Sequence, residues 1–151
     1  MIHQENSIER LNRRHPVLIS IRTQFVRKIM DGSKTFELRK KIFPTPVGRS
    51  VIFYSSGEDK AITARGVVAS VVEGTPAAIW IRLSGQLGIS RADFTEYFKG
   101  SDVAYAIELE HVLALENPIS LNEMRQDHGL EPPQSWRYLD RDSHAKLLER
   151  L

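Results

Sequence analysis

The segment at residues 32–41 constrains the fold more than any other part of the chain. It reads Gly-Ser-Lys-Thr-Phe-Glu-Leu-Arg-Lys-Lys, a helix-ending glycine followed by an alternating stretch. Phe36 and Leu38 alternate with polar residues, which predicts a strand with one face in a core and Glu37 and Arg39 on the other. A guanidinium and a carboxylate held on one face suit a polar or anionic ligand.

Apolar runs and helix signals surround this segment. Residues 17–21 form an apolar run typical of a buried strand, and Thr23 is the expected N-cap of a helix that Gly32 ends. Dense β-branched stretches at 51–54 and 62–72 predict two more strands. Gly66, inside the second of them, is the expected site of a bulge.

The second half of the chain contains several predicted helix starts and one long predicted strand. Thr75-Pro76 and Ser90 are expected to begin two helices, and residues 105–115 alternate as a strand that Asn117-Pro118 should end. Ser120 and Glu123 form a capping box, and a last helix is expected at 142–151. Short strands at irregular spacing among helices predict an α+β chain. Its expected architecture is a small β-barrel of about five to six strands with peripheral helices.

Length and composition limit the domain organisation. At 151 residues the chain is expected to form one domain at 16–116, preceded by a polar arm at 1–15. A helical extension at 117–151 is expected to pack on the same domain. The absence of cysteine excludes disulfides and thiolate metal sites and fits a reducing compartment, so we expect a cytoplasmic protein. We find neither a membrane-spanning apolar run nor an apolar signal-peptide core.

Charge is divided unevenly along the chain. Residues 1–50 hold 11 Lys and Arg against 4 Asp and Glu, a net +7, whereas residues 51–151 carry a net −5. A basic first part favours an anionic partner, although a solvated surface explains the same pattern.

Residues 32–39 also match the G-x-K-x-x-E-x-R signature of the ASCH family, a branch of the PUA-like superfamily. The order of elements over 17–115 fits the family as well, so the chain resembles an ASCH domain. The resemblance implies a small β-barrel with a cleft beside the signature strand, and it implies RNA or a modified nucleotide as partner. No cofactor is expected.

The candidate ligand-binding residues follow from this cleft. They are Lys34, Glu37, Arg39, Lys40 and Tyr54. Phosphate contacts suit the cations, and Glu37 can accept a hydrogen bond from an amino group on a base edge. Additional contacts to the nucleic-acid backbone are expected from Arg22, Lys41 and Arg49.

Each of these residues also has a purely structural interpretation. Glu37 and Arg39 could form an ion pair that steadies the barrel, and the lysines could be solvated charges. Tyr54 could be a half-buried core aromatic.

The alternative to a binding module is a hydrolase with Lys34 and Glu37 as catalytic proton-transfer groups. One ASCH branch resembles an amidohydrolase of acetylated cytidine that uses a Lys, a Thr three residues later and a distant Glu. Here Lys34 matches, but Glu37 stands in place of the Thr and residues 87–90 hold no carboxylate. A ribonuclease is the other form of this alternative, and the sequence leaves the choice between binding and turnover open.

Two remaining features of the sequence bear on other partners. The five histidines show no spacing typical of a metal site, so no metal is expected. Trp136 follows an extended Pro-Pro-Gln-Ser stretch, where it could stack on a base but more often fastens a tail to the domain. The C-terminal extension is also the surface where a protein partner could bind.

Overall fold

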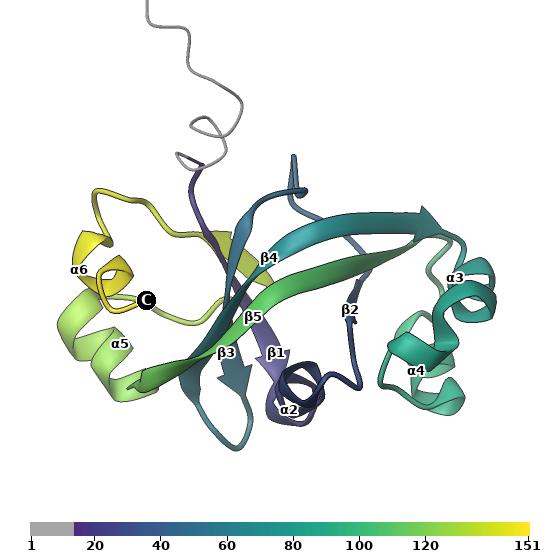
Figure 1. Ribbon diagram of the computed structural model, residues 1–151, viewed down its shortest axis with the longest axis horizontal. Helices are drawn as coiled ribbons and strands as arrows, with labels where there is room; N and C mark the ends of the chain where they lie inside the picture. Colours follow the sequence, from purple (N-terminus) through teal and green to yellow (C-terminus); the bar gives the residue numbers. More distant parts are fainter. Residues whose placement is uncertain (1–13) are drawn as a thin grey trace, which may run out of the picture.

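The computed structural model describes residues 14–151 and shows one curled six-stranded sheet with helices packed against it (Figure 1). The strands are β1 (Val17–Arg22), β2 (Phe36–Arg39), β3 (Ser50–Ser56), β4 (Ala61–Gly74), β5 (Ala104–Ser120) and β6 (Trp136–Tyr138). They lie in the order β2-β5-β4-β3-β1-β6, in which β1 and β3 are parallel and the other neighbours antiparallel. The α+β class and the expected number of strands are confirmed. Of the arm predicted at 1–15, residues 1–13 lie outside the described part.

The long strands β4 and β5 bend the sheet into a half-barrel. Their pairing shifts register at three places, one of them between Arg65 and Val67, which confirms the bulge predicted at Gly66. The predicted end of β5 at Asn117-Pro118 is wrong, because the strand runs on to Ser120. Pro118 falls where the register shifts between Ala114 and Ile119, and a proline is tolerated in an irregular stretch of this kind.

Helices cover the curled sheet at both ends and along its inner side (Figure 1). They are α2 (Thr23–Asp31), α3 (Pro76–Leu83), α4 (Arg91–Tyr97), α5 (Leu121–His128) and α6 (Ala145–Leu148), with a 3-10 turn η1 (Ser84–Gln86). The caps predicted at Thr75, Ser90 and Ser120 are confirmed, since each side chain accepts a hydrogen bond from the backbone three residues later.

The N-cap predicted at Thr23 is wrong. The cap residue is Arg22, which makes no side-chain capping bond, and Thr23 is already helical. The Thr23 hydroxyl instead donates to the carbonyl of Ser56 and accepts from the N–H of Asp59. Thr23 therefore ties the start of α2 to the turn between β3 and β4.

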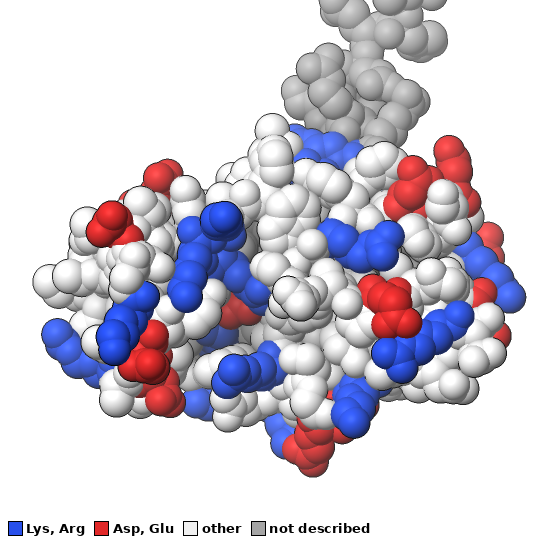
Figure 2. Space-filling model, turned by 180° about the vertical axis from the view of Figure 1, so that it is seen from behind, with Lys and Arg blue, Asp and Glu red and all other residues white. Residues whose placement is uncertain are grey.

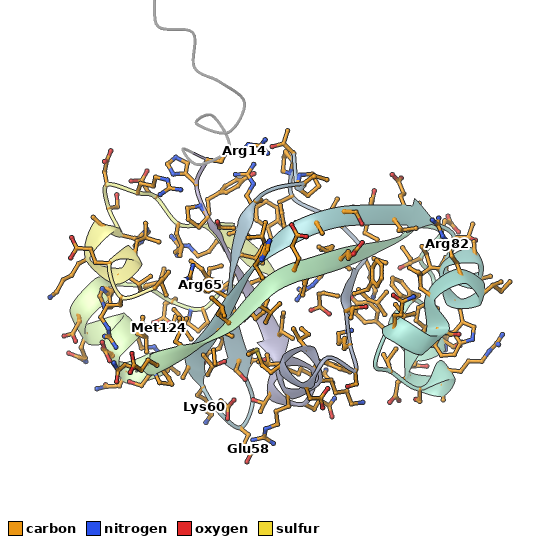
Figure 3. All side chains as sticks on the ribbon, viewed as in Figure 1. Arg14, Glu58, Lys60, Arg65, Arg82 and Met124 are labelled. Atoms are coloured by element: carbon orange, nitrogen blue, oxygen red, sulfur yellow. The ribbon has the colours of Figure 1, made fainter. Side chains whose placement is uncertain are left out.

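Apolar side chains gather in three clusters along the sheet. One lies beneath α2 around Phe53, one beneath α5 and α6 around Ile119, and one between β2, α3 and α4 around Phe94. Figure 3 shows how far apart the ends are: Met124 lies on α5 at one end and Arg82 on α3 at the other. The third cluster holds Phe36 and Leu38, the face of β2 that the sequence predicts to be apolar.

The C-terminal segment joins the sheet, a pairing that no local sequence pattern predicts. β6 pairs with β1, and the Trp136 ring makes edge contacts with Phe43 at 5.5 Å and Tyr138 at 5.3 Å. Trp136 thus fastens the tail to the domain. No helix among residues 14–151 is long and apolar enough to cross a membrane.

Candidate functional site

A pocket of about 760 Å³ opens where the curled sheet does not close on itself, between the β2 edge and β1. Its walls come from β1, α2, β2, α4 and the segment that precedes β6. The charged residues in these walls are Arg22, Lys34, Glu37, Arg39, Lys40, Lys41, Asp93 and Glu96. In the view from behind, Lys and Arg surfaces gather around a hollow beside the end of the molecule that carries α3 and α4 (Figure 2).

Arg39 bridges the opening of the half-barrel. Its Nη2 donates to the carbonyl oxygen of Ser20 on β1 at 2.7 Å and to Oε2 of Glu37 at 2.9 Å. Its Nη1 donates to Oγ of Ser135, just before β6, at 3.3 Å. One guanidinium therefore joins β2 to β1 and to the segment before β6, neither of which pairs with β2 in the sheet. The fork of N–H groups in the guanidinium makes this possible.

Glu37 is the buried counter-charge at the centre of the site. Its Oε2 accepts from Arg39, and its Oε1 accepts from the Leu38 N–H at 3.0 Å and lies 3.6 Å from Nζ of Lys34. Burial by itself raises the pKa of Glu37, but the positive charges of Arg39 and Lys34 outweigh it and hold the pKa below its ordinary value. The carboxylate is therefore charged at neutral pH and engaged through both oxygens.

Lys34 is almost fully enclosed, with 2% of its side chain exposed. Its Nζ donates to the carbonyl of Leu87 at 2.8 Å and lies 5.2 Å from the centre of the Phe25 ring. Burial lowers the pKa of Lys34, and the Glu37 carboxylate opposes this effect. The loop after η1 thus supplies a backbone acceptor to the signature lysine.

The rim of the pocket combines cations with an aromatic ring. Lys40 places its Nζ 5.0 Å from the centre of the Tyr97 ring, and the Tyr97 hydroxyl donates weakly to the Leu38 carbonyl at 3.4 Å. Burial raises the pKa of Tyr97, so its hydroxyl keeps its proton. Arg22 and Lys41 also line the pocket.

Two residues predicted for the site lie elsewhere. Tyr54 is 5% exposed and packs in the apolar cluster beneath α5 and α6, which agrees with the structural alternative. Arg49 is 6% exposed, and its guanidinium donates to the carbonyls of His15 and Pro44. Neither side chain lines the pocket. Strand β3 turns Tyr54 toward α5, and the Nη atoms of Arg49 donate to loop carbonyls.

Several residues in the pocket walls are not among those predicted from the sequence. Tyr97 is 38% exposed and lines the pocket with Asp93 and Glu96 of the same helix. Their spacing of three and four residues marks one polar face of α4, a signal that the sequence does contain. Gln134 and Ser135 line the pocket only because β6 joins β1, and no local pattern reveals that pairing. Among residues 14–151 no group of three or more His, Cys, Asp or Glu side chains is placed to hold a metal ion.

A curled six-stranded sheet with a charged cleft beside a short edge strand defines the class as a PUA-like fold. The model of the family described as "Domain of unknown function (DUF365)" matches residues 15–129, and the chain belongs to this family of ASCH domains.

One curated protein and two solved structures are similar to this chain. An ASCH domain-containing ribonuclease of Zymomonas mobilis is 25% identical over 136 residues, which cover 89% of this chain and 91% of that protein. The crystal structure of ASCH from Zymomonas mobilis superposes with a TM-score of 0.81 at 24% identity and covers 89% of this chain and 94% of the other. The N-terminal domain of Staphylothermus marinus McrB is more distant, with a TM-score of 0.54 at 14% identity over 89% of this chain and 93% of that domain, and it supports the fold alone.

Proposed function

We propose that this protein acts on RNA: it binds the strand in the pocket beside β2 and cleaves the phosphodiester backbone there. The observation that carries the proposal is the Lys34–Glu37–Arg39 network, which is held rigidly in the wall of a pocket large enough for a nucleotide. The similarity to a ribonuclease along nearly the whole chain supports turnover in addition to binding.

Binding of the RNA backbone falls to the cations of the pocket. Arg39 is the last residue of β2, and Lys40 and Lys41 follow it directly. Arg22 lies in the opposite wall of the pocket, at the end of β1. Cations around a concave site attract phosphate and concentrate it there. Arg49 is left out of this proposed binding set, since it does not line the pocket and its Nη atoms donate to loop carbonyls.

Cleavage would proceed by attack of the ribose 2′-oxygen on phosphorus. The 2′-hydroxyl proton goes to a base, the bond from phosphorus to the 5′-oxygen breaks, and that oxygen takes a proton from an acid. The products are a 2′,3′-cyclic phosphate and a 5′-hydroxyl end. In this proposal Arg39 stabilises the charge that develops on the phosphoryl oxygens, and Glu37 holds the guanidinium in place.

Lys34 and Glu37 remain the candidates for proton transfer. The burial that lowers the pKa of Lys34 brings its ammonium closer to the range where a proton is exchanged near neutral pH. The low pKa of Glu37 favours orientation of Arg39 over proton transfer.

A second candidate function is RNA recognition without turnover. It is favoured by the enclosure of Lys34 and Glu37, whose polar atoms already have partners within the protein. A site of this kind is rigid, as recognition requires, and the same cations would hold the strand.

One experiment separates these functions. Purified protein is incubated with 5′-labelled single-stranded RNA, with the same strand carrying one 2′-deoxy nucleotide at each cleaved position, and with N4-acetylcytidine. Cleavage that requires the 2′-hydroxyl and disappears in Lys34→Ala or Glu37→Gln, with binding kept within a few-fold, supports the ribonuclease. Binding without any cleavage supports recognition alone, and release of acetate would indicate an amidohydrolase. Lys146→Ala, an exposed change on α6 outside the pocket, is the matched control for nuclease contamination.

A further inference from the structure

The pocket carries carboxylates that plain phosphate binding does not explain. Asp93 and Glu96 line it from α4, opposite in sign to Arg39 at the end of β2 and to the two lysines that follow it. Because they lie three residues apart on a helix, both project from one face. A carboxylate near a bound phosphate weakens binding through like-charge repulsion, so these residues reduce affinity unless the ligand offers them something else.

These two side chains are also free to bind. In residues 14–151 neither carboxylate lies within 4.0 Å of a cationic side chain, and neither makes a side-chain hydrogen bond. The cations Arg22 and Lys41, which line the same pocket, are likewise without an ion-pair partner in this part of the chain. The pocket therefore presents unneutralised charge of both signs.

Glu37 is not available for the base-edge role that its sequence position suggests. Its two oxygens are engaged with Arg39, Lys34 and the Leu38 N–H. Among the carboxylates that line the pocket, those without a partner in residues 14–151 are the two of α4. Asp93 lies in the first turn of α4, where a negative charge stabilises the helix. Glu96 lies beyond the first turn and makes no such contribution to the helix.

We propose that Glu96 is a specificity-determining residue that accepts a hydrogen bond from the exocyclic amino group of a nucleobase while Arg39, Lys40 and Lys41 hold the neighbouring phosphate. This inference rests on the proposed function and names its substrate class: single-stranded RNA with an amino-bearing base, cytosine or adenine, in the pocket. Carboxylates accept from cytosine N4 in known base contacts, whereas uracil presents a carbonyl oxygen at that position, which a carboxylate repels.

The test measures binding of single-stranded oligo(C), oligo(A), oligo(U) and an abasic strand of equal length by fluorescence anisotropy. The inference predicts that wild-type protein binds oligo(C) or oligo(A) more tightly than oligo(U) by about fivefold or more, the lower end of what a paired base contact contributes. Glu96→Gln should bring this ratio close to one. It should also strengthen binding of oligo(U), because the repulsive charge is gone.

The matched control is Glu73→Gln. Glu73 is an exposed carboxylate on β4 that does not line the pocket, so its removal changes the net charge equally. It should leave the ratio between bases unchanged. Equal circular dichroism spectra and melting temperatures of the two variants establish that both are folded.

The outcomes distinguish this inference from the proposed function. If Glu96→Gln strengthens binding of all four strands equally, abasic strand included, the carboxylate only repels phosphate and the specificity role is overturned while RNA binding stands. The same holds if wild-type protein binds all strands with equal affinity. If wild-type protein binds none of them even at low salt, the proposed function itself fails, and this inference fails with it.

Discussion

Gly88 lies so close to Lys34 that a Cβ atom placed on the glycine would come within 2.7 Å of the lysine Cβ. Gly88 also has a φ of +61°, a conformation that side chains other than glycine's rarely adopt. The close approach lets the loop after η1 deliver the Leu87 carbonyl to Nζ of Lys34. The close packing of Gly88 against Lys34 and the hydrogen bond to the Leu87 carbonyl thus fix the position of the signature lysine.

Gly88→Ala should therefore destabilise the protein by about 2 kcal/mol, since it adds both backbone strain and a steric clash. The measurement is the free energy of unfolding in urea. Gly85→Ala is the control, because Gly85 lies on the adjacent turn with open space at its Cβ and no positive φ. Equal effects of the two substitutions would show that the contact with Lys34 has no energetic weight.

Glu37→Gln should lower the free energy of unfolding by about 3 kcal/mol, because it leaves Lys34 and Arg39 as buried cations without a counter-charge. Arg27 and Glu58 form an exposed ion pair that provides the comparison. Glu58→Gln should have little effect on stability, since exposed pairs contribute little. A loss in Glu37→Gln no larger than that in Glu58→Gln would contradict the buried network.

The contribution of Glu37 to stability should depend on pH in a defined direction. Its pKa is lower in the folded protein than in the unfolded chain, so the unfolded state takes up the proton first as pH falls. The stabilising contribution is complete above the unfolded value, near 4.3, and is lost as pH drops through the lowered folded pKa. The difference in unfolding free energy between wild type and Glu37→Gln should be constant from pH 7 to 5 and shrink below about pH 4.

RNA binding should distinguish Arg39 from the rim lysines. Lys41→Ala should weaken binding similarly for all sequences and reduce the slope of log affinity against log salt by about one. Arg39→Ala should remove most of the binding, and Arg39→Lys should not restore it, because an ammonium cannot span the acceptors that the guanidinium joins. Affinities over a salt series decide this, with Lys146→Ala as control. Identical losses for Arg39→Ala and Lys41→Ala would argue against a special role of Arg39.

Arg49→Ala should separate stability from binding. The change leaves the carbonyls of His15 and Pro44 without their donors, which should cost about 2–4 kcal/mol of unfolding free energy. RNA affinity of the folded variant should stay unchanged, because Arg49 does not line the pocket. Chemical denaturation and anisotropy titrations provide the two readouts. A large loss of affinity in a well-folded variant would return Arg49 to the nucleic-acid surface.

Local sequence was sufficient to predict which face of β2 enters the core and where several helices begin. The alternation of residues 35–39 correctly assigns Phe36 and Leu38 to the core and Glu37 and Arg39 to the pocket, because side-chain direction along a strand follows from position alone. The caps at Ser90 and Ser120 were also predictable, because each serine accepts its hydrogen bond from a backbone N–H only three residues later.

Tertiary structure alone decided what surrounds that strand. Tyr54 and Arg49 look available for binding in the sequence. In the structure Tyr54 packs beneath α5, and Arg49 donates hydrogen bonds to loop carbonyls. Gln134, far along the chain, reaches the pocket because β6 pairs with β1. A sequence pattern reports the geometry of a few neighbouring residues, whereas the partners of a side chain depend on which distant segments the whole core brings beside it.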